Sequence, residues 1–161
     1  MYKRQPLFID DSPNMTLVEI RAKCRRLKQK FGLKLIVIDY LQLMTSGKRV
    51  ESRQQEVSEF SRALKLLAKE LELPVIAMSQ LNRGSEQRQD KKPMLSDLRE
   101  SGSIEQDADM VMMIHREDMY EKESPRAGEA DIMLVKHRNG PTANVTVAFQ
   151  GHYSRFVDMA N

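Results

Sequence analysis

The chain has 161 residues, of which 40% are hydrophobic and 30% are charged, and its formal net charge is +3. These values predict a soluble globular protein with a sizeable core. They exclude a membrane-spanning chain, because no apolar stretch is long enough to cross a bilayer, and an internal disulfide, because Cys24 is the only cysteine. Since the N-terminus also lacks the pattern of a signal peptide, we expect a cytoplasmic protein.

The N-terminal part of the chain predicts a strand followed by a helix. A short apolar run at 7–9 indicates the first strand, and the turn-forming residues 10–14 follow it. Thr16-x-x-Glu19 is a capping box, which predicts the start of a helix, and Gly32 is suited to its C-terminal cap. Between these two signals, apolar residues recur at helical spacing: Leu17, Ile20, Cys24, Leu27 and Phe31.

The next part of the chain predicts two strands that flank a second helix. The apolar run at 35–38 indicates a strand around 34–38 that is buried on both faces, as in a parallel sheet. After a polar loop at 45–53, the capping box Ser52-x-x-Gln55 predicts a long helix that ends before Pro74. Another buried strand is predicted at 75–78. The apolar stripe of the second helix consists of Val57, Phe60, Leu64, Leu67 and Leu71.

The C-terminal half predicts loops and antiparallel strands. The charged segments 82–103 and 116–128 are predicted to be loops. The Asn-Gly pair within 137–141 predicts a β-hairpin. Strands are predicted at 110–114, 132–135 and 145–149. The whole pattern, β-α-β-α-β followed by further strands, predicts an α/β fold: a mostly parallel sheet flanked by helices, with antiparallel strands at the C-terminal end.

Two polar positions predict half of an ATP site. Asp39 follows the strand at 34–38, and Gln80 follows the strand at 75–78, so both are expected at the same edge of the sheet, where ligands bind in open α/β folds. An aspartate there is the Walker B position, which holds nucleotide-bound Mg²⁺ in phosphate-loop ATPases. The phosphate-binding pattern G-x-x-x-x-G-K-[ST] occurs nowhere in the chain, and 47–49 (Gly-Lys-Arg) lacks its other residues.

Two further features are not expected to form sites. The basic residues of the first helix, which include Lys23, Arg25 and Lys28, are predicted to face solvent. His115 and His137 are not candidate metal ligands, because no cluster of Cys and His has metal-binding spacing.

Six motifs, in order along the chain, resemble those of the C-terminal ATPase domain of bacterial replicative DNA helicases, the DnaB family. The resemblance implies a partial RecA-like fold in which 1–161 is the C-terminal portion of the ATPase domain. It also implies that the phosphate-binding loop, the catalytic glutamate and the N-terminal collar domain of the family lie upstream of residue 1. The motifs lie at 35–44, 52–62, 78–83, 92–102, 105–109 and 136–141.

The resemblance implies four nucleotide-site residues. Asp39 would orient Mg²⁺ on the β- and γ-phosphates of ATP, and Gln80 would sense the γ-phosphate. Lys136 and Arg138 would reach into the ATP site of the next subunit, with Arg138 as the arginine finger. The alternative interpretations are an N-cap or turn aspartate for Asp39, a solvated glutamine for Gln80, and a basic hairpin tip in water for Lys136 and Arg138.

The resemblance also implies a segment that binds single-stranded DNA, formed by Arg99, Glu100 and Gly102. An arginine can pair with a phosphate, and a glycine leaves its backbone N–H open to one. Because backbone contacts ignore base sequence, we expect binding that depends strongly on salt. A charged surface loop without a ligand is the alternative interpretation of these residues.

As a whole, the resemblance implies part of an ATP-dependent helicase that forms a hexameric ring on single-stranded DNA and moves 5′ to 3′ at the replication fork. It implies ATP and Mg²⁺ as cofactors, and a primase and a helicase loader as partners. We expect the chain on its own to be inactive and to self-associate through exposed apolar sheet surface. Two alternatives remain: a RecA-like recombination or repair ATPase, and a non-catalytic single-strand-binding or ring-subunit module.

Overall fold

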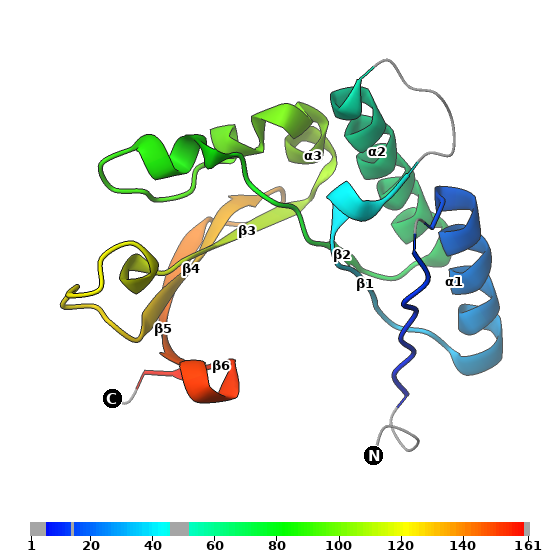
Figure 1. The fold of residues 1–161 in the computed structure, drawn as a ribbon. Coiled ribbons are helices and arrows are strands. Elements are labelled where there is room, and N and C mark those ends of the chain that lie inside the picture. The colour runs from blue at the N-terminus through cyan, green and yellow to red at the C-terminus, as the bar shows by residue number, and fades with distance from the viewer. Residues whose placement is uncertain (1–5, 14, 46–51, 160–161) are drawn as a thin grey trace. The chain divides into compact units, whose positions relative to one another are not determined.

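The computed structural model describes residues 6–13, 15–45 and 52–159. They form two compact units (Figure 1). The first unit contains residues Met1–Gln80 and Ser101–Asp107, and the second contains Leu81–Glu100 and Ala108–Asn161. Each unit has a sheet of its own, so each is described by itself.

The first unit is a parallel strand pair next to two long helices. β1 and β2 pair in parallel, with Ile36 opposite Val75 and Ile38 opposite Ala77, which confirms the predicted parallel arrangement. Figure 1 shows α1 and α2 side by side, next to this pair. The elements are α1 (Leu17–Phe31), β1 (Ile36–Ile38), the 3-10 helix η2 (Leu41–Leu43), α2 (Arg53–Leu71), β2 (Val75–Ala77) and α3 (Gly102–Asp107).

Both predicted helix starts are confirmed by their caps. The Thr16 hydroxyl accepts a hydrogen bond from the Glu19 N–H at 3.4 Å, and the Glu19 carboxylate accepts one from the Thr16 N–H at 2.8 Å. The Ser52 hydroxyl accepts from the Gln55 N–H at 3.2 Å at the start of α2. Gly32 caps the end of α1 with φ of +66°, in the left-handed region that glycine adopts without strain.

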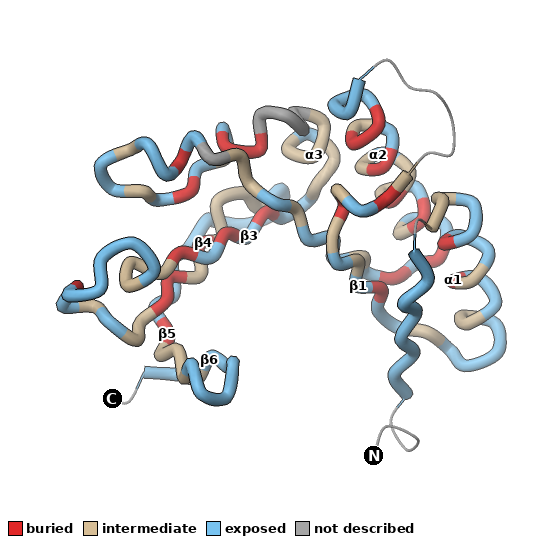
Figure 2. The backbone as a smooth tube through the Cα atoms, viewed as in Figure 1, coloured by how far each residue is buried: buried red, intermediate tan, exposed pale blue. Residues whose placement is uncertain are grey.

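The core of the first unit lies between the helices and the strand pair. Phe60 is 0% exposed and Leu41 is 1% exposed, and the predicted apolar stripe of α2 is buried along its length (Figure 2). Cys24 is buried as well, and burial raises the pKa of its thiol. The buried cluster consists of Ile20, Cys24, Ile36, Leu41, Met44, Phe60, Leu64, Leu67, Leu71 and Leu73.

Two predictions about this unit's strands are wrong. The run at 7–9 forms no strand, and its side chains are exposed. β1 is not buried on both faces, because Ile36 faces the core whereas Val37 is 52% exposed. Its register partner Ile76 is 43% exposed, so the two share a face that no described element covers. An apolar strand is buried on both faces only where a second layer packs on it.

We predicted that the basic residues of α1 face solvent, but several of them contact α2 instead. Arg25 forms an ion pair with Glu70 of α2, and Arg21 reaches the same carboxylate at 2.6 Å. Hydrogen bonds from both arginines lower the pKa of Glu70, and the bond from Arg25 has the largest effect. Lys28 donates to the backbone carbonyl of Leu71. Part of the basic face therefore connects α1 to α2.

The second unit is an antiparallel sheet of four strands in the order β3-β4-β5-β6. The predicted hairpin of β4 and β5 is confirmed, but their pairing ends at Leu134 opposite Ala143, so the connection is longer than an Asn-Gly turn. The strand β6 had no clear sequence signal. The strands are β3 (Met110–His115), β4 (Glu129–His137), β5 (Ala143–Gln150) and β6 (Arg155–Asp158).

The predicted long loops contain short helices. The segment 82–103 forms two 3-10 helices, η3 (Arg83–Gln87) and η4 (Leu95–Ser101), before α3 begins, so the prediction of a loop throughout is wrong. The other segment, 116–128, contains η5 (Glu117–Met119), and η6 (Gly151–Tyr153) precedes β6. Leu98 of η4 packs with Val111, Met113 and Met133 into the second unit's core. Short helices of this kind carry too few residues for a periodic signal.

Among the residues described, no helix is long and apolar enough to cross a membrane.

Truncating the centre of the first core should destabilise the fold strongly. We expect Phe60→Ala to lower the free energy of unfolding by about 3–5 kcal/mol, because it removes a fully buried ring and leaves a cavity. Leu66→Ala on the same helix is the control, since Leu66 is 60% exposed and the loss should stay below about 0.5 kcal/mol. Urea unfolding followed by circular dichroism measures both, and equal losses would contradict this core.

Candidate nucleotide site and strand-binding segment

The structure brings Asp39 and Gln80 to the same edge of the parallel strand pair. Past the last register pair, the Met78 N–H donates to the Ile38 carbonyl at 2.9 Å, and the Leu41 N–H donates to the Met78 carbonyl at 2.9 Å. Asp39 lies between Ile38 and Leu41, Gln80 lies two residues after Met78, and both are exposed. The peptide bond between Asp39 and Tyr40 is cis. An exposed carboxylate and an exposed amide at one sheet edge are polar groups that suit a metal-bound phosphate.

Gln42 connects the two strand ends, and sequence reasoning missed it. Its side-chain amide donates to the Ser79 hydroxyl at 3.1 Å and to the Gln80 carbonyl at 3.2 Å. The Gln80 N–H in turn donates to the Gln42 side-chain oxygen at 3.2 Å. A glutamine three residues after an aspartate is too common a pattern to indicate such a bridge from sequence alone.

Arg53, in the first turn of α2, supports the segment that carries Gln42. Its guanidinium donates to the Gln42 carbonyl at 2.6 Å and to the Met44 carbonyl at 3.1 Å. It also forms an ion pair with Glu56, which is 7% exposed. The start of α2 is therefore tied to the edge that carries Asp39 and Gln80, through contacts that the sequence pattern did not indicate.

The predicted DNA-binding residues lie where one short helix follows another. The backbone of Arg99 and Glu100 belongs to η4, and Gly102 is the first residue of α3. The chain just before them is anchored by Asp97, which is 4% exposed.

Asp97 makes several hydrogen bonds at once. It accepts from two nitrogens of Arg88, at 2.8 and 2.6 Å, and from the Met94 N–H at 2.7 Å. The hydrogen bonds from Arg88 are the main reason that the pKa of Asp97 is lowered. The backbone carbonyl of Asp97 accepts a hydrogen bond from the Asn82 N–H at 3.2 Å, which joins the two ends of the segment 82–97.

Lys136 and Arg138 lie at the end of β4. Lys136 is opposite Val111 of β3, and the Arg138 N–H donates to the Asp109 carbonyl at 2.8 Å. The Arg138 guanidinium lies 3.4 Å from the Asp109 carboxylate, and both side chains are about half exposed. Lys136 and Arg138 are thus on the second unit, whereas Asp39 and Gln80 are on the first.

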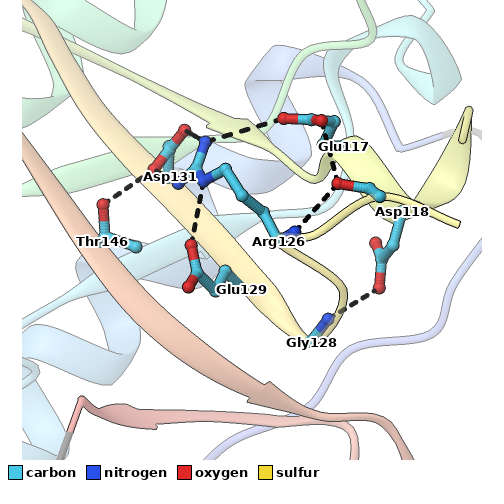
Figure 3. Close-up of polar contacts among 8 residues, drawn as sticks. Glu117, Asp118, Arg126, Gly128, Glu129, Asp131 and Thr146 are labelled. Carbon is cyan, nitrogen blue, oxygen red and sulfur yellow. Dashed lines mark hydrogen bonds and ion pairs between the residues drawn. The ribbon is translucent and has the colours of Figure 1, made fainter.

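A charged cluster around Arg126 holds the other end of β4 (Figure 3). The Arg126 guanidinium donates to the Asp131 carboxylate at 2.6 and 2.9 Å and to the Glu129 carboxylate at 2.9 Å. Thr146 of β5 donates to Asp131 at 2.9 Å. These hydrogen bonds lower the pKa of Asp131 to about 2, and those from Arg126 have the largest effect. The carboxylate therefore stays charged in the folded protein.

His115 ends β3 in a buried position. It is 4% exposed, its ring stacks on Tyr120 with centroids 6.1 Å apart, and burial lowers its pKa. Among the residues described, no group of three or more His, Cys, Asp or Glu side chains is arranged to hold a metal ion.

Comparison with known proteins identifies the family. The sequence model for "DnaB-like helicase C terminal domain" matches residues 1–158. This chain belongs to the DnaB-like helicase C-terminal domain family. The RecA-like α/β fold implied by the motifs is confirmed by similar solved structures. One of these is an ATPase domain with a TM-score of 0.86 and 46% identity, over 91% of this chain and 52% of that one.

Similar curated proteins are named replicative DNA helicases. The chain is 81% identical over 155 residues to the replicative DNA helicase DnaB of Leifsonia xyli, which is 96% of this chain and 34% of that protein. It is 58% identical to the DnaB of Geobacillus stearothermophilus over 95% of this chain and 34% of that protein. A structure of a DnaB-like replicative helicase and its interactions with primase has a TM-score of 0.90 at 45% identity, over 94% of this chain and 38% of that one. The chain therefore spans about a third of the length of the curated relatives it matches.

The Arg126 cluster predicts a specific dependence of stability on pH. Because the pKa of Asp131 is about 2 in the fold and 3.8 ordinarily, its contribution is complete above about pH 4 and is lost as the pH falls towards 2. That contribution is worth about 2 kcal/mol. We expect Asp131→Asn to lower the free energy of unfolding at pH 7 by this order and to flatten its fall between pH 4 and 2.

Asp158→Asn is the control, because Asp158 is an exposed aspartate on β6 and its substitution should cost less than about 0.5 kcal/mol. Urea unfolding at a series of pH values measures both variants. An acid dependence that is identical in Asp131→Asn and the unsubstituted chain would contradict the assignment.

Proposed function

We propose that this chain is the C-terminal portion of the ATPase domain of a replicative, ATP-dependent DNA helicase subunit. The observation that carries the proposal is the shared sheet edge of Asp39 and Gln80, in a chain that belongs to the DnaB-like family. The curated relatives are named replicative DNA helicases, which favours this function over a recombination or repair ATPase. We expect it to act in the bacterial cytoplasm.

The nucleotide site would use Asp39 and Gln80 on one side. The exposed Asp39 carboxylate fits a hard cation such as Mg²⁺, which prefers oxygen ligands and keeps several of its waters. When bound, Mg²⁺ would neutralise charge on the β- and γ-phosphates of ATP. The Gln80 amide can donate to a phosphate oxygen and accept from the attacking water, so its environment differs between ATP and ADP.

Lys136 and Arg138 would complete the site of a neighbouring subunit in a hexameric ring. Arg138 is mounted at the end of a strand, its backbone bonded to Asp109, and half of its side chain is exposed. A guanidinium held in this way could exchange a carboxylate for a phosphate, since it pairs with both in a bidentate geometry. Its positive charge would stabilise the transition state of phosphoryl transfer.

Arg99, Glu100 and Gly102 would contact single-stranded DNA. Their backbone follows the segment anchored by Asp97, which restricts where these residues can lie. Arg99 would pair with a phosphate, the Gly102 N–H would donate to one, and Glu100 would position a neighbouring group. Contacts of this kind suit movement along any sequence, here 5′ to 3′ as in the family. One similar structure is described as that of a DnaB-like replicative helicase and its interactions with primase, so primase is the first partner to test, followed by a helicase loader.

A chimeric helicase tests the function directly. The 155 matched residues of the Leifsonia xyli relative are replaced by those of this chain, so that the relative supplies the remaining two thirds of the subunit. We expect ATP hydrolysis that single-stranded DNA stimulates, and unwinding of a forked duplex. Asp39→Ala should abolish both activities. A folded hexameric chimera that binds DNA without hydrolysing ATP would instead support the alternative that the chain is a non-catalytic single-strand-binding or ring-subunit module.

Mixed rings test whether Arg138 acts on the neighbouring subunit. When each is assembled alone, the Asp39→Ala chimera and the Arg138→Ala chimera should have ATPase rates lower by about 10³-fold or more. Mixed in equal amounts before assembly, they should regain a measurable fraction, because some interfaces then combine an intact Asp39 with an intact Arg138. A mixture as inactive as its two components would show that both residues serve the same subunit.

Salt dependence tests the DNA-binding segment. We expect Arg99→Ala to weaken binding to single-stranded DNA of every sequence and to reduce the slope of log K against log salt by about 0.7, the value for one lost phosphate contact. Arg62→Ala is the control, because Arg62 is an exposed arginine on α2 and its loss should leave the slope unchanged. Fluorescence anisotropy with labelled oligonucleotides at several salt concentrations measures both, and equal slopes would contradict the assignment of Arg99.

A further inference from the structure

The Gln42 side chain binds the backbone of Gln80 in the way that another strand would. Its amide nitrogen donates to the Gln80 carbonyl at 3.2 Å, while its amide oxygen accepts from the Gln80 N–H at 3.2 Å. The same nitrogen reaches the Ser79 hydroxyl at 3.1 Å. Both polar groups of the Gln80 backbone are therefore engaged by one side chain, beyond Ala77, where the register between β1 and β2 ends.

This contact matters because β2 is short. Only Val75–Ala77 form regular pairs with β1, Met78 adds backbone hydrogen bonds to Ile38 and Leu41, and the chain continues past them to the exposed Gln80. Without a further constraint, backbone at such an end would sample several conformations. The two hydrogen bonds to Gln42 fix the direction in which the exposed Gln80 side chain leaves the sheet.

Gln42 is itself held in place from α2. Arg53 donates to the Gln42 carbonyl at 2.6 Å and to the Met44 carbonyl at 3.1 Å, and it also pairs with the buried Glu56. The packing of this segment depends on its neighbour Leu41, which is 1% exposed. The Gln42 side chain thus contributes hydrogen bonds to Gln80 rather than apolar packing to the core.

We propose that Gln42 is a positioning residue that aims Gln80 at the terminal phosphate. The proposal rests on the nucleotide site proposed above. Gln42 would not touch ATP, so its loss should leave nucleotide binding intact and lower the rate of hydrolysis. A displaced catalytic group commonly costs up to about a hundredfold in rate.

The test uses the full-length chimera with Gln42→Ala, Gln42→Glu and the control Gln54→Ala, an exposed glutamine on α2. We expect Gln42→Ala to lower kcat for ATP about tenfold to a hundredfold while KM stays within about twofold. Gln42→Glu should lower kcat as much as Gln42→Ala does, because a carboxylate keeps the size of the side chain but cannot donate to the Gln80 carbonyl. Gln54→Ala should match the unsubstituted chimera.

A double-mutant cycle separates positioning from an independent effect. If Gln42 acts only through Gln80, then Gln42→Ala should have no further effect on kcat in a Gln80→Ala background. Additive losses, or a Gln42→Ala variant with unchanged kcat, would overturn the proposal while leaving the proposed function in place. A loss confined to thermal stability, with kcat unchanged, would also overturn it. An unsubstituted chimera that folds without hydrolysing ATP would overturn the proposed function itself, and the role of Gln42 in hydrolysis with it.

Discussion

The candidate nucleotide site depends on the parallel pairing of β1 with β2. Two parallel strands end at the same edge of a sheet, so residues that follow them are brought together although about forty positions separate them in the chain. The register then decides which residues meet. With Ile38 opposite Ala77, Asp39 and Gln80 both come after the last regular pair, and a shift of one residue would turn the flanking apolar side chains to the opposite face.

α2 serves both the core and the edge of the strand pair. One stripe of the helix, with Phe60 at its centre, is buried in the first unit's core. Its first turn supplies Arg53, whose guanidinium binds two backbone carbonyls of the segment after β1. The same hydrophobic burial that stabilises the helix therefore places a cation at the site. These bonds, together with the burial of Leu41 and Met44, explain how the segment after β1 keeps a defined backbone.

The second unit relies on charged pairs near its sheet. Arg126 connects three carboxylates at one end of β4, and Arg88 holds the buried Asp97 two residues before the predicted DNA-binding segment. Removing one member of such a pair would leave an uncompensated charge, because Asp97 and Asp131 are both mostly excluded from water. Ion pairs of this kind fix local backbone where few apolar residues are available for packing.

Features that arise from local chemistry could be predicted from the amino-acid sequence. Capping hydroxyls, the glycine after α1 and the 3.6-residue stripe of α2 all express rules that operate within a few residues, and the structure has each of them. The apolar runs were sufficient to predict the two strand ends that carry Asp39 and Gln80, and the order of motifs was sufficient to identify the family. The assigned roles of these residues, of Lys136 and Arg138, and of the DNA-binding segment remain predictions.

The contacts between distant groups became visible only in the folded chain. There, Gln42 binds the backbone of Gln80, Arg25 crosses to Glu70, and Val37 is exposed. None of these has a local signal, because a side chain's partner and the layer that covers a strand depend on packing between elements far apart in the chain. The 3-10 helices between 83 and 101 escaped prediction because they carry too few residues for a periodic signal, and contacts within the segment such as Arg88 with Asp97 stabilise them.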